Sequence, residues 1–64
     1  MDGVNWTELI GKKVFIKIKS GFQYSGVVSE IADTGDNFIW IHLKDKFDKL
    51  VVVLNSEIVE LVEK

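Results

Sequence analysis

A few polar side chains carry the chemistry that the sequence suggests. His42 is the single histidine and there is no cysteine, so thiolate–imidazole metal sites and histidine-activated nucleophiles lack their residues. Asp33 and Asp36 lie three residues apart and could form an acid–base pair or contact a divalent cation. Acids at this spacing beside a glycine are more typical of turns. The sequence therefore predicts no catalytic residue, no metal ligand, no cofactor and no enzyme activity.

Charge is distributed unevenly along the chain. Eight lysines and ten acids give a formal net charge of −2, and there is no arginine, which argues against a general phosphate-binding surface. Four lysines fall within residues 12–19, whereas Glu57, Glu60 and Glu63 lie near the other end. This asymmetry could attract nucleic acid locally, attract a second copy of the chain, or be plain solvated surface charge.

Length and composition predict one small globular domain over residues 1–64. Hydrophobic residues make up 47% of the chain, but no run approaches the roughly 20 apolar residues of a membrane span. The N-terminus lacks the basic segment and apolar core of a signal peptide. We therefore expect a cytoplasmic location and no membrane partner.

The order of the elements predicts a mainly β fold. Asn5 and Glu8 have the spacing of a helix N-cap and its N3 acid, and Gly11 suits the position after a C-cap, so a short helix is expected over about residues 6–10. After Gly11 the hydrophobic period changes to two. Strands are predicted over about residues 12–19, 23–31, 38–44, 49–54 and 57–62. Five short strands with brief connections and no proline favour a small, strongly bent antiparallel barrel of SH3-like architecture.

Two glycines indicate that this sheet is strongly bent. Gly21 follows a strand-like run and can take the positive φ of a turn. Gly26 lies inside an apolar and aromatic pattern, where a glycine marks a bulge, a sharp bend or a close backbone approach. A hairpin curved in this way would let a very short chain close a barrel.

The later strands suggest contacts with partners. If Ile39, Ile41 and Leu43 face the core, His42 points outward, and Phe47 is expected at a loop tip where it could contact a partner.

The segment 50–54 is apolar on both faces and uncharged, although an edge strand of a monomer is usually protected by charge, proline or a bulge. This predicts a homo-oligomer built through the fourth and fifth strands. The residues predicted at that interface are Val51, Val53, Ile58 and Leu61.

The segment 9–28 resembles the first motif of the Sm-like (LSm) family of small five-stranded barrels with an N-terminal helix. The match consists of a Gly-Lys-x-Val lead, residues 11–14, that enters a strand, and of Gly21 and Gly26 on either side of an aromatic residue. The similarity covers about residues 5–62. It implies a ring of subunits in which the fourth strand of one pairs with the fifth strand of the next, and single-stranded RNA bound along the inner rim.

The ligand-binding motifs of the family are only partly present. Asp33 and Asn37 have the mutual spacing of the family's Asp and Asn, if one residue is inserted before them. Gly35 stands where a base-stacking side chain is sought. In the second motif, Leu54 takes the place of a phosphate-binding arginine and Asn55 that of a glycine. The resemblance therefore implies Asp33, Asn37 and Asn55 as the RNA-binding residues.

Two functions are compatible with these observations. The first is an Sm-like RNA-binding module acting as a homo-oligomeric ring. The alternative is an Sm-fold protein-interaction or assembly element that has lost RNA binding. The missing arginine and stacking residue favour the alternative, while Asp33, Asn37 and the lysine-rich first strand favour the RNA-binding ring, which is the preferred hypothesis.

Overall fold

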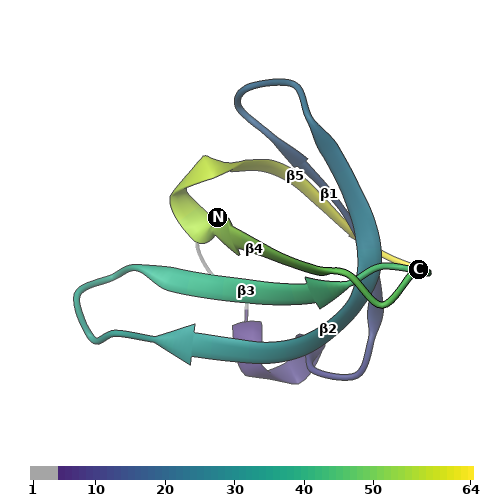
Figure 1. The fold of residues 1–64 in the computed structure, drawn as a ribbon. Coiled ribbons are helices and arrows are strands. Elements are labelled where there is room, and N and C mark those ends of the chain that lie inside the picture. Colours follow the sequence, from purple (N-terminus) through teal and green to yellow (C-terminus); the bar gives the residue numbers. More distant parts are fainter. Residues whose placement is uncertain (1–4) are drawn as a thin grey trace.

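The computed structural model describes residues 5–64, which form one antiparallel sheet and two single turns of 3₁₀-helix. The elements are η1 (Trp6–Leu9), β1 (Lys13–Ile18), β2 (Gln23–Asp33), β3 (Ile39–Lys44), β4 (Leu50–Leu54), η2 (Asn55–Glu57) and β5 (Ile58–Glu63). The strand order is β4-β3-β2-β1-β5, so β4 and β5 are the two edges (Figure 1). The predicted mainly β class is confirmed, while the first four residues of the predicted domain lie outside the described ones. Neither helical segment within residues 5–64 has the length and apolar character needed to span a membrane.

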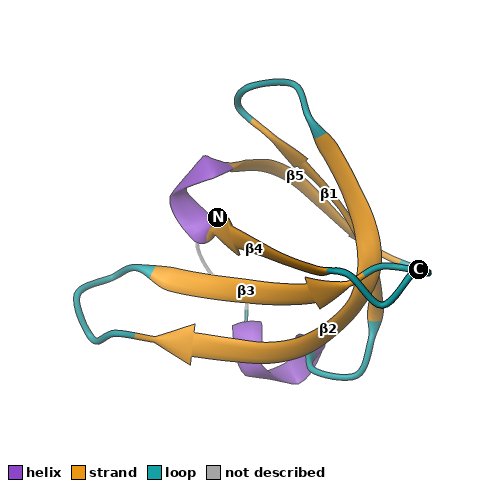
Figure 2. Ribbon diagram, in the orientation of Figure 1, coloured by secondary structure: helices purple, strands orange, loops and turns teal. Residues whose placement is uncertain are grey.

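The sheet curls around one core but is not closed. β2 is the longest strand, with 11 residues, and it runs as a continuous curved ribbon past both of its neighbours (Figure 2). The two edge strands contribute Val53 and Ile58 to the same core cluster. β4 and β5 are nevertheless not hydrogen-bonded to each other within the described residues, so the predicted closed barrel is not formed by backbone pairing.

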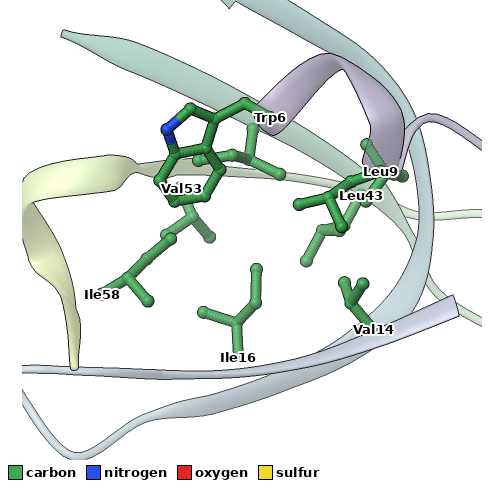
Figure 3. Packing of buried hydrophobic residues seen from close by; sticks show 9 residues of the cluster. Trp6, Leu9, Val14, Ile16, Leu43, Val53 and Ile58 are labelled. Carbon is green, nitrogen blue, oxygen red and sulfur yellow. The ribbon is translucent and has the colours of Figure 1, made fainter. Parts of the chain in front are cut away.

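The core follows the period of two that the sequence predicts. β3 buries Ile41 and Leu43 and turns the residues between and beside them outward. η1 packs onto the same cluster through Trp6 and Leu9 (Figure 3). The buried residues are Trp6, Leu9, Val14, Ile16, Val28, Ile41, Leu43, Val53 and Ile58. Among the described residues no polar or charged side chain is buried, so this core is held by apolar packing alone.

The predicted helix over residues 6–10 is one turn of 3₁₀-helix, and its predicted N-cap bond does not form. Asn5 has an extended backbone, but its Oδ1 accepts a hydrogen bond from Thr7 Oγ1 at 2.9 Å and caps no backbone N–H. Four residues are too few to sustain an α-helix, and the turn is stabilised by the packing of Trp6 and Leu9. Gly11 has a φ of 86°, as expected after the end of a helix.

Gly26 lies where the backbone of β2 comes closest to the end of β3. A Cβ built on Gly26 would collide with the carbonyl oxygen of Lys44 and would lie 2.9 Å from its carbonyl carbon. The predicted close backbone approach is confirmed. The bulge of β2 lies further along, at Ser29, where the register with β3 shifts. Gly21 has the predicted positive φ, 94°.

The basic and acidic parts of the chain meet within the sheet. β1 pairs with β5, with Lys17 opposite Glu60, and Lys12 Nζ lies 3.2 Å from Glu63 Oε1. Exposed pairs of this kind contribute about 0–1 kcal/mol to stability. Their main effect is to set lysines beside glutamates on neighbouring strands of one chain, which reduces the separation of charge seen along the sequence.

Candidate functional site

The three candidate RNA-binding residues gather at one end of the sheet, around the β2–β3 loop. Asp33 ends β2 and is paired with Ile39 of β3. Asn37 lies in the loop, and Asn55 begins η2. Asn55 Nδ2 donates to the carbonyl oxygen of Asn37 at 3.3 Å, and Asn55 Oδ1 accepts from the backbone N–H of Ile39 at 3.1 Å. The structure thus brings Asn37 and Asn55 into contact, and Asp33 lies at the end of β2, opposite the first residue of β3.

The loop itself is ordered by its own polar side chains. Asp33 Oδ1 accepts a hydrogen bond from the Gly35 N–H at 2.9 Å. Thr34 Oγ1 donates to Asp36 Oδ1, which also accepts from the Phe38 N–H at 3.4 Å. The bond from Thr34, followed by the bond from Phe38, holds the pKa of Asp36 below its ordinary value of 3.8. The turn chemistry predicted for Asp33 and Asp36 is confirmed, because each carboxylate binds groups of the loop.

Asn55 stands where the resembled family has a glycine, and its backbone is helical. The positive φ lies instead at Asn37, with φ 70°. Both ends of the Asn55 amide are already used inside the chain. Exposed rings stand next to this cluster, since Phe38 follows Asn37 and is partly exposed together with Trp40. The family motifs do not include these rings, but the alternation of residues 38–42 predicts that they point outward, as observed.

The side chains predicted at an oligomer interface point towards the core. Val53 and Ile58 are buried, and Val51 and Leu61 are half-buried against the same cluster. The apolar side chains that β4 and β5 expose are the others: Leu50, Val52, Val59 and Val62. These four exposed side chains are available for a contact through the edges, and the interface at Val51, Val53, Ile58 and Leu61 stays a prediction.

Both edge strands keep one side unpaired within residues 5–64. A free edge presents a row of N–H and C=O groups to any strand that can align with it. β4 has no charged residue in its five positions, whereas β5 carries Glu60 and Glu63. The chain thus offers two edges of different chemistry.

His42 lies on the outer face of the sheet, as predicted. Its neighbours across the strands are Glu30 on β2 and Val52 on β4. His42 Nδ1 lies 3.8 Å from Glu30 Oε2, which makes an ion pair only when the imidazole is protonated. In the part of the chain that the structure describes, no three histidine, cysteine or acidic side chains are grouped to hold a metal ion.

A groove of about 490 Å³ lies between β2 and the β3–β4 loop. Its more buried lining includes Tyr24, Leu43 and Val51, and its exposed lining includes lysines and Phe47. Phe47 is 73% exposed, which confirms its predicted place at a loop tip. The groove could not be predicted from the sequence, because the β2 bend and the β3–β4 loop are distant along the chain.

Comparison of the chain with protein-family models, with curated proteins and with solved structures gave no match in any of the three. The residues and the geometry described above are therefore what supports a function.

Proposed function

We propose that this chain is a cytoplasmic, Sm-like, strongly bent barrel that assembles into a homo-oligomeric ring and binds single-stranded RNA. The observation that carries the proposal is the strand order β4-β3-β2-β1-β5, which gives one chain two free edges of different sequence. Pairing β4 of one copy with β5 of the next makes a head-to-tail contact, and such contacts close into a ring when the rotation allows. The barrel interpretation is supported by the curl that places Val53 and Ile58 in one core.

The chemistry of the edges supports this pairing. β4 exposes Leu50 and Val52, and β5 exposes Val59 and Val62. An uncharged edge without proline is prone to pair with another strand. Pairing would satisfy the free backbone groups of both edges and cover part of this apolar surface, which is favourable at about 25 cal/mol per Å² removed from water.

Two charge variants test the ring. Val52→Lys places an ammonium group on the β4 edge, and Val59→Lys places one on the β5 edge. Each alone is expected to lower the mass measured by light scattering after size exclusion to that of one chain, 7.3 kDa. Since the contact is head-to-tail, an equal mixture of the two variants should form a dimer through its one intact pair of edges. Val27→Lys is the control, because Val27 is as exposed (43%, against 46% for Val52) but lies on the interior strand β2.

The outcomes separate the possible assemblies. A wild-type mass of 7.3 kDa across micromolar concentrations would contradict the ring. If Val59→Lys stays oligomeric while Val52→Lys does not, the contact joins β4 to β4 and the head-to-tail arrangement is wrong. Circular dichroism checks that each variant keeps its sheet.

RNA binding is proposed at Asp33, Asn37 and Asn55. Exposed polar groups of the loop lie next to the rings of Phe38 and Trp40, and stacking a base on such a ring contributes about 1–3 kcal/mol. Asn37→Gly removes the amide while keeping the positive φ of this position. It should weaken binding of labelled uridine- or adenine-rich RNA, measured by fluorescence anisotropy.

Ser20→Ala, in the β1–β2 turn, is the control for Asn37→Gly. The control should bind RNA as the wild type does. Equal affinities of the two variants would count against RNA contact at this loop.

A second function, an assembly or protein-interaction element without RNA binding, is favoured by one observation. The amide oxygen of Asn55 accepts a hydrogen bond from Ile39, and its amide nitrogen donates one to Asn37. Leu54 beside it carries no charge. If this function is right, the ring mass is retained, but Asn37→Gly leaves the binding of labelled RNA unchanged even at low salt. The RNA titration therefore decides between the two functions.

A further inference from the structure

The groove between the β2 bend and the β3–β4 loop is locally cationic. Lys13, Lys44 and Lys46 line it against one acid, Asp45, although the whole chain has a net charge of −2. Asp45 Oδ1 accepts hydrogen bonds from two backbone N–H groups of the loop, at 2.8 and 2.9 Å, so this carboxylate holds the loop. Lys44 Nζ lies 3.5 Å from Asp48, and both side chains are exposed, a weak pair that a phosphate can replace.

Aromatic surface lies beside these lysines. Phe47 presents a ring that is 73% exposed, and Lys46 Nζ lies 5.1 Å from the centroid of this ring. Tyr24 is half-buried and lines the same groove. Positive charge next to a flat apolar ring matches a ligand that joins an anion to an aromatic ring system.

Contacts within the chain hold the walls of the groove in place. Gly26 lets the end of β3 pack directly against β2. The loop is closed by backbone bonds from the Asp45 N–H to the Lys49 carbonyl at 3.1 Å and from the Asp48 N–H to the Asp45 carbonyl at 3.0 Å. A preformed site loses less conformational entropy on binding.

We propose that this groove is a nucleotide-binding site. The base stacks on Phe47, and the phosphate lies among Lys13, Lys44 and Lys46. A volume of about 490 Å³ falls within the roughly 300–1,000 Å³ of small-molecule sites. Lysines act as point charges and stacking tolerates every base, so the site accepts nucleotides without strong base preference, free or as units of a single strand.

This site is separate from the polar cluster at Asn37 and Asn55. The two lie at opposite ends of β3, which extends about 17 Å from Ile39 to Lys44 at roughly 3.4 Å per residue. The proposal does not require the ring. A monomeric wild type, or an Asn37→Gly variant with unchanged RNA affinity, contradicts the proposed function and leaves the groove proposal standing.

An NMR titration of the ¹⁵N-labelled chain with adenosine monophosphate tests the site. The amide signals of Gly26, Lys46 and Phe47 should shift and saturate together. Phe47→Ala should weaken binding roughly 5- to 150-fold, the loss expected for one stacked base. Phe22→Ala is the matched control, because its ring is 65% exposed and lies in the β1–β2 turn, outside the groove.

A second pair of variants tests the phosphate contact. Lys46→Ala should weaken binding, whereas Lys19→Ala, an exposed lysine outside the groove, should not. Equal effects of Phe47→Ala and Phe22→Ala, or of the two lysine variants, would overturn the proposal. So would inorganic phosphate that binds as tightly as adenosine monophosphate, since the base would then contribute nothing.

A short single-stranded RNA identifies the source of the nucleotide. If the strand shifts the same amides and displaces adenosine monophosphate at lower concentration, the groove serves a strand. If the mononucleotide binds as tightly as the strand, the groove serves free nucleotides. Both results support the site, and no saturable shift at these amides with either ligand rejects it.

Discussion

At the scale of single residues, Gly26 is the position at which the fold tolerates least change. The atoms that a Cβ would meet belong to the backbone of Lys44 and Asp45, which cannot rotate away as a side chain can. Gly26→Val should therefore destabilise the protein by about 1–3 kcal/mol through strain or overpacking. Urea melts measure this change. Ser25→Val is the control, because Ser25 is exposed on the same strand, and equal midpoints for the two variants would contradict the close approach.

Asp36 gives the β2–β3 loop a dependence on pH. Its pKa is held below 3.8 by the hydrogen bond from Thr34, so it favours the folded loop above the pKa of the unfolded chain. This contribution is lost as the pH falls through the lower, folded pKa. Thr34→Val removes the main donor and should move the midpoint of the Asp36 titration, followed by NMR, upward towards its ordinary value. Thr7→Val, whose hydroxyl binds Asn5, is the control, and an unmoved midpoint in Thr34→Val would contradict this cause.

At the scale of elements, Asn55 ties η2 to the β2–β3 loop. Its amide makes two hydrogen bonds, to Asn37 and to Ile39, each contributing roughly 0.5–1.5 kcal/mol net. Asn55→Ala should therefore lower the free energy of unfolding by about 1–3 kcal/mol and speed hydrogen exchange at the Ile39 amide. Ser56→Ala is the neighbouring control, and matching exchange rates in both variants would show that the tie contributes nothing.

The strands could be predicted because their signal is local. Short apolar or alternating runs bounded by turn residues place each of the five strands to within two residues of its observed ends. The sequence predicts the position of the N-terminal helix correctly but not its type. One turn of 3₁₀-helix and the start of an α-helix share the same capping and glycine signals. Such signals do not encode which helical hydrogen bonds form in a segment this short.

The sequence does not predict which side chains of β4 point towards the core. All five of its residues are apolar, so the sequence gives no alternation to follow. The choice is made by the register with β3, where Val53 lies opposite the buried Ile41 and Val52 opposite the outward His42. The contact between Asn37 and Asn55 in the candidate site could not be predicted either, because the two residues are 18 positions apart in the chain.

At the scale of the whole molecule, the affinity of this acidic chain for RNA, a polyanion, should fall as the salt concentration rises. If the three lysines of the groove each neutralise one phosphate of a single strand, the logarithm of the affinity should fall with the logarithm of salt at a slope of about −2. This corresponds to a loss of roughly 20-fold between about 50 and 200 mM salt. Anisotropy titrations of labelled RNA at both salt concentrations measure it. Tight binding that ignores salt would contradict a site built from lysines.

The attachment of β5 sets how the molecule responds to mechanical force. Among the described strands β5 is paired only with β1, and the Lys64 N–H donates to the Lys13 carbonyl oxygen at 2.8 Å, where β1 begins and β5 ends. A force that pulls residues 13 and 64 apart acts on this rung first, then on the pair Val14 and Glu63, and so on along the ladder. Because the rungs are loaded one after another and never all at once, β5 would be peeled away at low force while the other strands keep their pairing.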